Sequence, residues 1–156
     1  MQTQRTLKLA ATNYETRTET FQGREHLVVP VVALVEGVIH AMNSAQPELV
    51  TAEEFTKVPM GWNGRPVYEG HPVVNGDPVP GNSPKLLEEK CIGIIFNAAI
   101  RKGKLTMEAW VDVAKAQEVA PDMLSRIAEG SPIEISVGVF CETDEDETGE
   151  FEGRKY

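Results

Sequence analysis

The stretch Cys91–Asp112, CIGIIFNAAIRKGKLTMEAWVD, decides the fold. Two apolar segments, Cys91–Ile100 and Lys104–Val111, flank the short glycine-containing link Arg101–Gly103, which is typical of a β-hairpin. In the second segment, successive side chains would point to opposite faces, with apolar residues at every second position, as in a half-buried strand. One face would carry Leu105, Met107, Ala109 and Val111, and the other Thr106, Glu108, Trp110 and Asp112.

Downstream of this hairpin, apolar residues recur at helical spacing from residue 112 to residue 129, and Gly130 suits the position after a helix. Pro121 lies inside this segment, so either one helix starts near Ala120 or two helices meet there. Ile133–Phe140 then alternates as a strand, with Ile133, Ile135, Val137 and Val139 opposite Glu134, Ser136, Gly138 and Phe140.

Upstream, the β-branched stretch His26–Ala41 predicts a strand in which Gly37 marks a bulge or bend. Thr51 followed by Glu54 resembles a capping box and predicts a short helix over 52–57. Residues 59–84 are rich in proline and glycine, and such long connections in compact domains are usually functional or disordered. The apolar side chains within it favour an ordered, functional loop: Trp62, Val67, Tyr68 and Val73.

The two ends of the chain carry weaker patterns. Residues 1–25 are polar and predict a loosely ordered N-terminal arm, although residues 16–21 also fit a short edge strand. The acidic residues 142–150 predict a turn, and 151–156 fit the start of a returning strand. We therefore expect an α+β fold: a small, mostly antiparallel β-barrel or curled sheet, with one main helix (about 112–129) and one short helix (about 52–57) outside. Residues 26–156 would form a single domain.

Composition excludes several classes of protein. The chain has 156 residues, 24 acidic and 15 basic side chains and a net charge of −9, which argues against a nucleic-acid partner. No apolar run approaches the roughly 18 residues of a membrane span, and the N-terminus has no secretory pattern. The two cysteines predict reduced thiols and a cytoplasmic origin.

The acidic segment 142–156 contains a partial match to a calcium-binding loop. Residues 142–156 hold 7 acidic and 2 basic side chains, and Asp144–Gly149 matches the first half of a calcium loop. The twelfth position of that loop is Lys155, where a bidentate Glu is needed. We therefore expect a solvated turn, no metal and no cofactor.

Ser136 and His71 are the strongest candidates for chemistry. Ser136 shares a strand face with Gly138, which leaves room for a substrate backbone, but a serine needs a base to act as a nucleophile. His71 lies in the 59–84 loop and is a better candidate base than His26 or His40, which flank a strand. The structural alternatives are a strand serine bonded to backbone and a loop histidine packed on Trp62.

Two segments carry a resemblance to a known family. Gly64–Pro72, GRPVYEGHP, resembles the histidine motif of the tailed-phage prohead (capsid maturation) serine proteases. Gly130–Phe140, GSPIEISVGVF, resembles their serine motif, a Ser-x-Gly in a strand after a helix ending in Gly. The resemblance covers roughly residues 30–141. The two motifs follow in the same order and at a similar spacing as in the family, and the pattern of strands and helix between them also agrees. This family is distantly similar to the herpesvirus assemblins.

The resemblance implies an assemblin-like barrel and a serine endopeptidase that cleaves scaffold and capsid proteins during phage head maturation. Ser136 would be the nucleophile and His71 the general base. The substrates would be the scaffold protein and the major capsid protein, met in the host cytoplasm inside the assembling prohead, with self-association as a further expectation. Independently of the resemblance, the composition predicts no nucleic-acid partner and no membrane, and we expect no cofactor.

The third catalytic residue does not carry over from the family, whose orienting residue tends to lie downstream of the serine strand. Either it lies beyond a C-terminal truncation of the protease-like domain, or it lies within this chain. The weak candidates are Glu134, Glu108 and Asp112. The alternative function is a non-catalytic β-rich capsid or scaffold assembly module, and a weaker third one is a calcium-binding β-domain.

Overall fold

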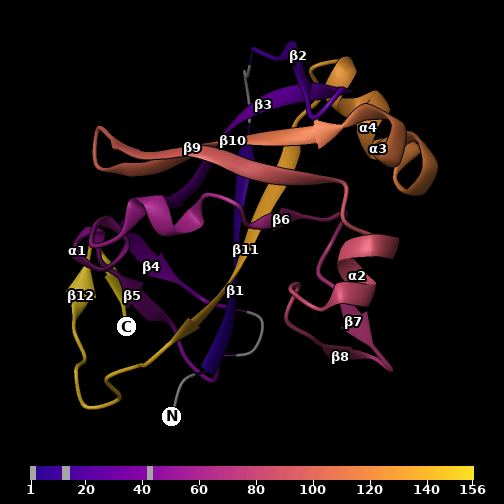
Figure 1. Cartoon of the computed structure of the whole chain (residues 1–156). Helices are drawn as coiled ribbons and strands as arrows, with labels where there is room; N and C mark the ends of the chain where they lie inside the picture. Colours follow the sequence, from indigo (N-terminus) through magenta and orange to yellow (C-terminus); the bar gives the residue numbers. More distant parts are fainter. Residues whose placement is uncertain (1–2, 12–14, 42–43) are drawn as a thin grey trace.

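A five-stranded antiparallel sheet forms the centre of the protein (Figure 1). The structure is a computed structural model and describes residues 3–11, 15–41 and 44–156, with residues 3–11 described at the backbone level. The strands of this sheet, in spatial order, are β2 (Arg17–Phe21), β3 (Arg24–Val35), β10 (Lys104–Asp112), β9 (Gly93–Arg101) and β6 (Pro66–Val67).

The predicted hairpin is confirmed as β9 and β10. Lys102 and Gly103 both adopt a positive φ, 51° and 72°, the left-handed backbone that matches a tight hairpin to the twist of its strands. The predicted alternation holds as well, because the inward side chains of β10 are all buried: Leu105, Met107, Ala109 and Val111.

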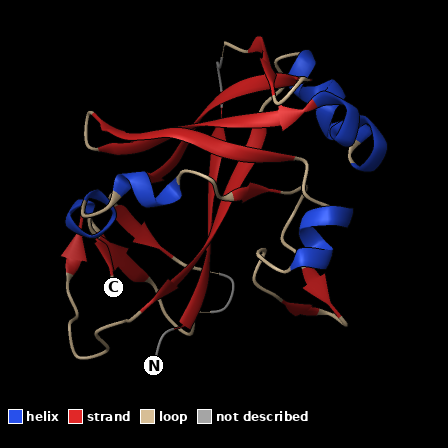
Figure 2. Cartoon of the chain, in the orientation of Figure 1, coloured by secondary structure: helices blue, strands red, loops and turns tan. Residues whose placement is uncertain are grey.

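A second pair of strands runs across this sheet. β1 (Thr3–Ala11) pairs antiparallel with β11 (Ile133–Cys141), and both contact β3. Figure 2 shows the two strands crossing behind the central sheet. Among the described residues no ladder joins β11 to β6, so the α+β fold is a curled sheet and not a closed barrel.

The N-terminal 25 residues differ from the predicted loose arm, since their described part supplies β1 and β2. Residues 1–2 and 12–14 of that arm lie outside the described residues. β2 is a mostly exposed edge strand paired with β3. An edge strand covers little of the core and needs few apolar side chains, so its sequence pattern is weak although it pairs with β3 along its whole length.

The helices differ from the prediction in two respects. The expected main helix is two helices, α3 (Val113–Val119) and α4 (Pro121–Ala128). Ala120 between them has φ −146° and ψ 51°, because a proline disfavours helical backbone at the residue before it. α1 (Ala52–Thr56) confirms the predicted short helix, but Thr51 makes no side-chain capping bond, so the capping box does not form.

The 59–84 loop is ordered and contains elements that the sequence pattern did not predict. It holds the 3-10 helix η1 (Pro59–Trp62) and a small hairpin of β7 (Val73–Val74) and β8 (Asp77–Pro78), and α2 (Pro84–Glu89) follows. The Ser83 hydroxyl accepts a bond from the Leu86 N–H and caps α2, and Pro84 occupies its first turn.

Short hairpins complete the fold. The predicted strand over 26–41 ends at Val35 and resumes as β4 (Gly37–Ile39), which pairs with β5 (Glu48–Val50). The C-terminal segment does not return along β11. It forms a hairpin of its own, β12 (Glu150–Phe151) with β13 (Arg154–Lys155). Within the described ranges, no helix has the length and apolar character required to cross a membrane.

The core lies where the curled sheet meets the helices and β11. The inward side chains of β3 and β10 pack with Ile127 of α4 and Val137 of β11. Trp62 and Val67 extend this core to the 59–84 loop, as predicted for two of its four apolar anchors, whereas Val73 is 50% exposed. The loop is therefore held against the same core as β11.

Candidate active site

His71 is positioned by the loop that leaves β6. β6 pairs with β9, which fixes the start of the segment. The Tyr68 hydroxyl donates a 2.5 Å hydrogen bond to the Gly81 carbonyl and ties the two arms of the loop together. Gly70 has a φ of +72°, a backbone conformation that side chains disfavour, and it turns the chain so that His71 follows on the inner side.

Ser136 is positioned by the middle of β11. It pairs across the ladder with Lys8 of β1, and its neighbour Val137 is buried in the core. Because side chains alternate along a strand, anchoring Val137 on one face directs Ser136 to the other. The Ser136 side chain is half-buried.

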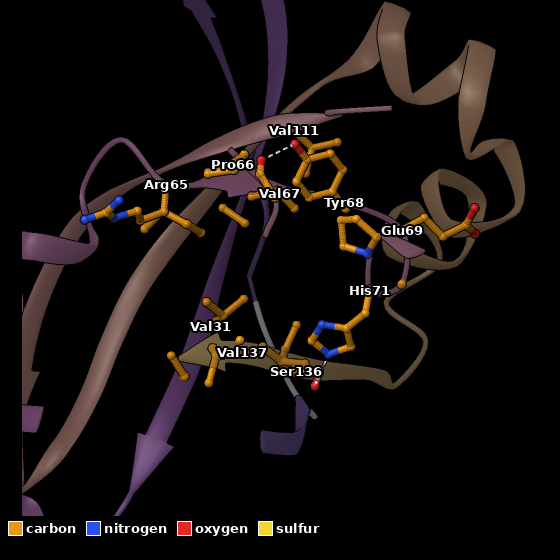
Figure 3. Close-up of a pocket in the computed structure, with 18 of the residues that line it drawn as sticks. Val31, Arg65, Pro66, Val67, Tyr68, Glu69, His71, Val111, Ser136 and Val137 are labelled. Atoms are coloured by element: carbon orange, nitrogen blue, oxygen red, sulfur yellow. Dashed lines mark hydrogen bonds between the residues drawn. The ribbon is translucent and has the colours of Figure 1, made fainter. Parts of the chain in front are cut away.

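The two predicted residues meet. His71 Nε2 and Ser136 Oγ are 2.7 Å apart and hydrogen-bonded, across 65 residues of chain (Figure 3). When the ring is neutral with its proton on Nδ1, the serine hydroxyl donates to Nε2. This is the contact that a serine needs if a base is to take its proton during attack on a carbonyl.

Both residues line one cavity of about 830 Å³. This volume lies within the range of small-molecule pockets, about 300 to 1,000 Å³. Its walls come from the loop after β6, from β11 and from α4, and its floor comes from the central sheet. A substrate carbonyl could therefore approach Ser136 from a space that also exposes His71.

The three candidate carboxylates lie in different environments. Glu134 lies two residues before Ser136 on β11 and lines the same cavity. Glu108 does not line it: both its oxygens accept from the Arg17 guanidinium, at 2.8 and 3.0 Å, and it also accepts from Asn97 and Trp110. The Arg17 bonds lower the pKa of Glu108 to about 2, and Glu108 in turn raises the pKa of Arg17.

Asp112 also has a structural role. It is buried and caps α3, since its Oδ1 accepts from the Lys115 N–H at 3.1 Å. Its Oδ2 lies 2.6 Å from the guanidinium of Arg24, and it does not line the cavity. Of the three candidates, Glu134 is thus the one that lines the same cavity as His71 and Ser136.

The other two histidines lie outside the cavity. His26 is buried, not at the surface, and its Nδ1 is 3.1 Å from the Arg24 carbonyl oxygen. It packs edge-on against Phe21 on the other face of the sheet from the cavity floor, in a cluster completed by Phe96 and Trp110. His40 is exposed beyond β4.

The acidic segment shows no ligand set. Asp144 Oδ1 accepts from the Asp146 N–H at 3.1 Å, a local turn contact, before the β12–β13 hairpin. In the part of the chain that the structure describes, no group of three or more His, Cys, Asp or Glu side chains is arranged to hold a metal ion.

Sequence reasoning missed several residues of the cavity. Tyr68 was predicted only as a packing anchor, although it ties down the loop that carries His71. Four residues of α4 also line the cavity: Asp122, Met123, Arg126 and Ile127. Phe140 lies on the Ser136 face of β11 and is 59% exposed at the rim. Phe140 could have been predicted, because it lies four residues after Ser136 and therefore on the same strand face. The residues of α4 could not, because nothing in the sequence of the helix indicates which strands it packs against.

Comparison with known proteins adds no assignment. The chain matches no protein-family model, no curated protein and no solved structure.

Proposed function

We propose that the protein is a serine endopeptidase in which Ser136 is the nucleophile and His71 the general base. The observation that carries this proposal is the 2.7 Å contact between His71 Nε2 and Ser136 Oγ at a cavity of about 830 Å³. A second support is the resemblance of the segments around both residues to the phage prohead proteases.

The reaction would follow from this geometry. Ser136 Oγ attacks the substrate carbonyl carbon while His71 Nε2 takes the hydroxyl proton. The tetrahedral intermediate then breaks its C–N bond, and His71 returns the proton to the leaving amine. Water, activated by the same histidine, hydrolyses the acyl-enzyme and regenerates Ser136.

The substrates would be the scaffold and major capsid proteins of a phage head, cleaved inside the assembling prohead in the host cytoplasm. Self-association remains a prediction. It is not required to bring the two residues together, because His71 and Ser136 are hydrogen-bonded within a single chain.

Co-expression tests this function. The full chain is expressed with the scaffold and capsid proteins of the same head, and cleavage is followed by gel and mass spectrometry. We expect discrete cleavage products with the native chain and none with Ser136→Ala. Equal cleavage by both proteins would contradict the proposal.

The second candidate, a non-catalytic assembly module, is favoured by exposed apolar side chains just before and within the 59–84 loop and on α2. They include Val58, Met60, Val74 and Leu87, between 41% and 67% exposed. Exposed apolar groups can mark contacts with partners. This candidate predicts that Ser136→Ala assembles with the head proteins as the native chain does and that neither protein cleaves them.

A further inference from the structure

The cavity that holds Ser136 and His71 changes in polarity with depth. Every buried residue that lines it is apolar. The floor comes from the inward faces of the central strands, with Val31, Met107 and Ala109 each at most 8% exposed. Ile127 of α4, 4% exposed, closes one side.

The charged residues of the cavity all lie at its rim. Each of them is an exposed residue: Arg65, Glu69, Asp122, Arg126 and Glu134. A charged group placed on the floor would lose its hydration and meet no polar side chain there. An apolar group placed on the floor would leave water and contact other apolar atoms.

The position of Ser136 determines which substrate group is nearest to this floor. The residue that supplies the attacked carbonyl must lie within bonding distance of Ser136 Oγ. Its side chain is therefore the one held in the cavity beside the serine. Six consecutive residues of β11, 133–138, line the cavity, so it extends along the strand on either side of Ser136.

We propose that this cavity is an apolar specificity pocket, which selects substrates with a large aliphatic or aromatic side chain on the acyl side of the scissile bond. The inference rests on the function proposed above and names the substrate class of the same site. Met107 and Ile127 would contact the end of that side chain, and Met123 would contact its flank.

Acyl esters of p-nitrophenol test the proposal on the full chain. Ser136 would attack the ester carbonyl and release p-nitrophenolate, and the acyl chain would occupy the pocket. We expect kcat/KM to rise at least about tenfold from acetate to hexanoate, since burying each methylene is worth roughly threefold in binding. The hemisuccinate, with as many carbons as butyrate but a terminal carboxylate, should react about tenfold more slowly than butyrate.

Two matched variants test whether the chain-length dependence arises in this cavity. Met123→Glu places a charge on the cavity wall and should flatten the chain-length profile. Leu87→Glu introduces the same charge on α2, outside the cavity, and should leave the profile unchanged. If Met123→Glu does not fold, Phe140→Glu serves instead, because Phe140 is 59% exposed at the rim and its replacement leaves the core intact.

The outcomes separate the two proposals. Ester hydrolysis that depends on Ser136 but does not rise with chain length, or that favours the hemisuccinate, overturns the pocket assignment and leaves the protease intact. A chain-length profile that Met123→Glu and Phe140→Glu leave unchanged also overturns it. Hydrolysis of every ester at the same rate by the native chain and Ser136→Ala contradicts the protease and, with it, this inference.

Discussion

His71 Nε2 lies 2.7 Å from Ser136 Oγ, although the two residues belong to different structural units. One is carried by the loop after β6, at the edge of the central sheet, and the other by β11, which pairs with β1 outside that sheet. The curl of the sheet brings these two units together over a shared apolar core. The contact is thus a product of the whole fold.

The first prediction concerns the base. Glutamine in place of His71 can still form a hydrogen bond with Ser136, but it cannot accept the proton. We expect His71→Gln to lower kcat by about a thousandfold or more while the melting temperature changes little. The matched control is His40→Gln, which replaces an exposed histidine outside the cavity. Equal kinetics for the two variants would exclude His71 as the base.

The second prediction concerns the orienting carboxylate. Glu134 lines the cavity, whereas Glu108 is bonded to Arg17 on another part of the sheet. We expect Glu134→Gln to lower kcat by about tenfold or more without changing the melting temperature, and Glu108→Gln to leave kcat unchanged. Steady-state kinetics measures kcat for each variant, and thermal unfolding measures its melting temperature. A loss of rate confined to Glu108→Gln would reverse the assignment.

The third prediction is a pH dependence of stability. The Arg17 bonds lower the pKa of Glu108 from 4.5 to about 2. A lowered pKa in the folded state stabilises the protein above the unfolded pKa, and this stability is lost as the pH falls from about 4.5 to about 2. The Arg17 side chain is 43% exposed, so solvent screens the ion pair, and we expect it to contribute only about 1 kcal/mol.

Urea unfolding at several pH values checks this prediction. Glu108→Gln should be less stable than the native chain at pH 7, and the difference should shrink steadily on acidification below pH 4.5. Glu19→Gln is the control, since Glu19 accepts a single bond from the same Arg17 and is 44% exposed. A difference that persists unchanged at pH 2 would show that the ion pair does not supply this stability.

The fourth prediction concerns the loop that carries His71. Burial raises the pKa of Tyr68, and its hydroxyl bonds to the Gly81 carbonyl. Tyr68→Phe should cost about 1 kcal/mol of stability and speed amide hydrogen exchange across residues 59–84. Activity should fall several-fold, because His71 would be held less firmly. Tyr156→Phe, outside the cavity, is the control, and equal exchange in both variants would contradict the anchoring role.

The local features of the fold could be predicted from the sequence. The β9–β10 hairpin follows from a short glycine turn between two apolar runs, and β11 follows from strict alternation. Pro121 marked the junction of α3 and α4, with two helices as one of two open possibilities. Ser83 followed by Pro84 was also a readable helix start, although it lay within a proline-rich stretch interpreted as loop.

The non-local features could not be predicted. No local pattern indicates that β1 pairs with β11, because an antiparallel ladder depends on backbone hydrogen bonds that any two strands can make. The roles of Glu108 and Asp112 depended on Arg17 and Arg24, which are distant in sequence. The candidate pair itself was predicted from its motifs, whereas its apolar floor depended on how the sheet curls.

The most direct measurement is covalent labelling of the full chain with a fluorophosphonate, read by intact mass and peptide mapping. The account predicts a single adduct on Ser136, which is absent from Ser136→Ala and forms much more slowly in His71→Gln. It would be contradicted if the native chain gained no adduct, or if Ser136→Ala were labelled at the same rate.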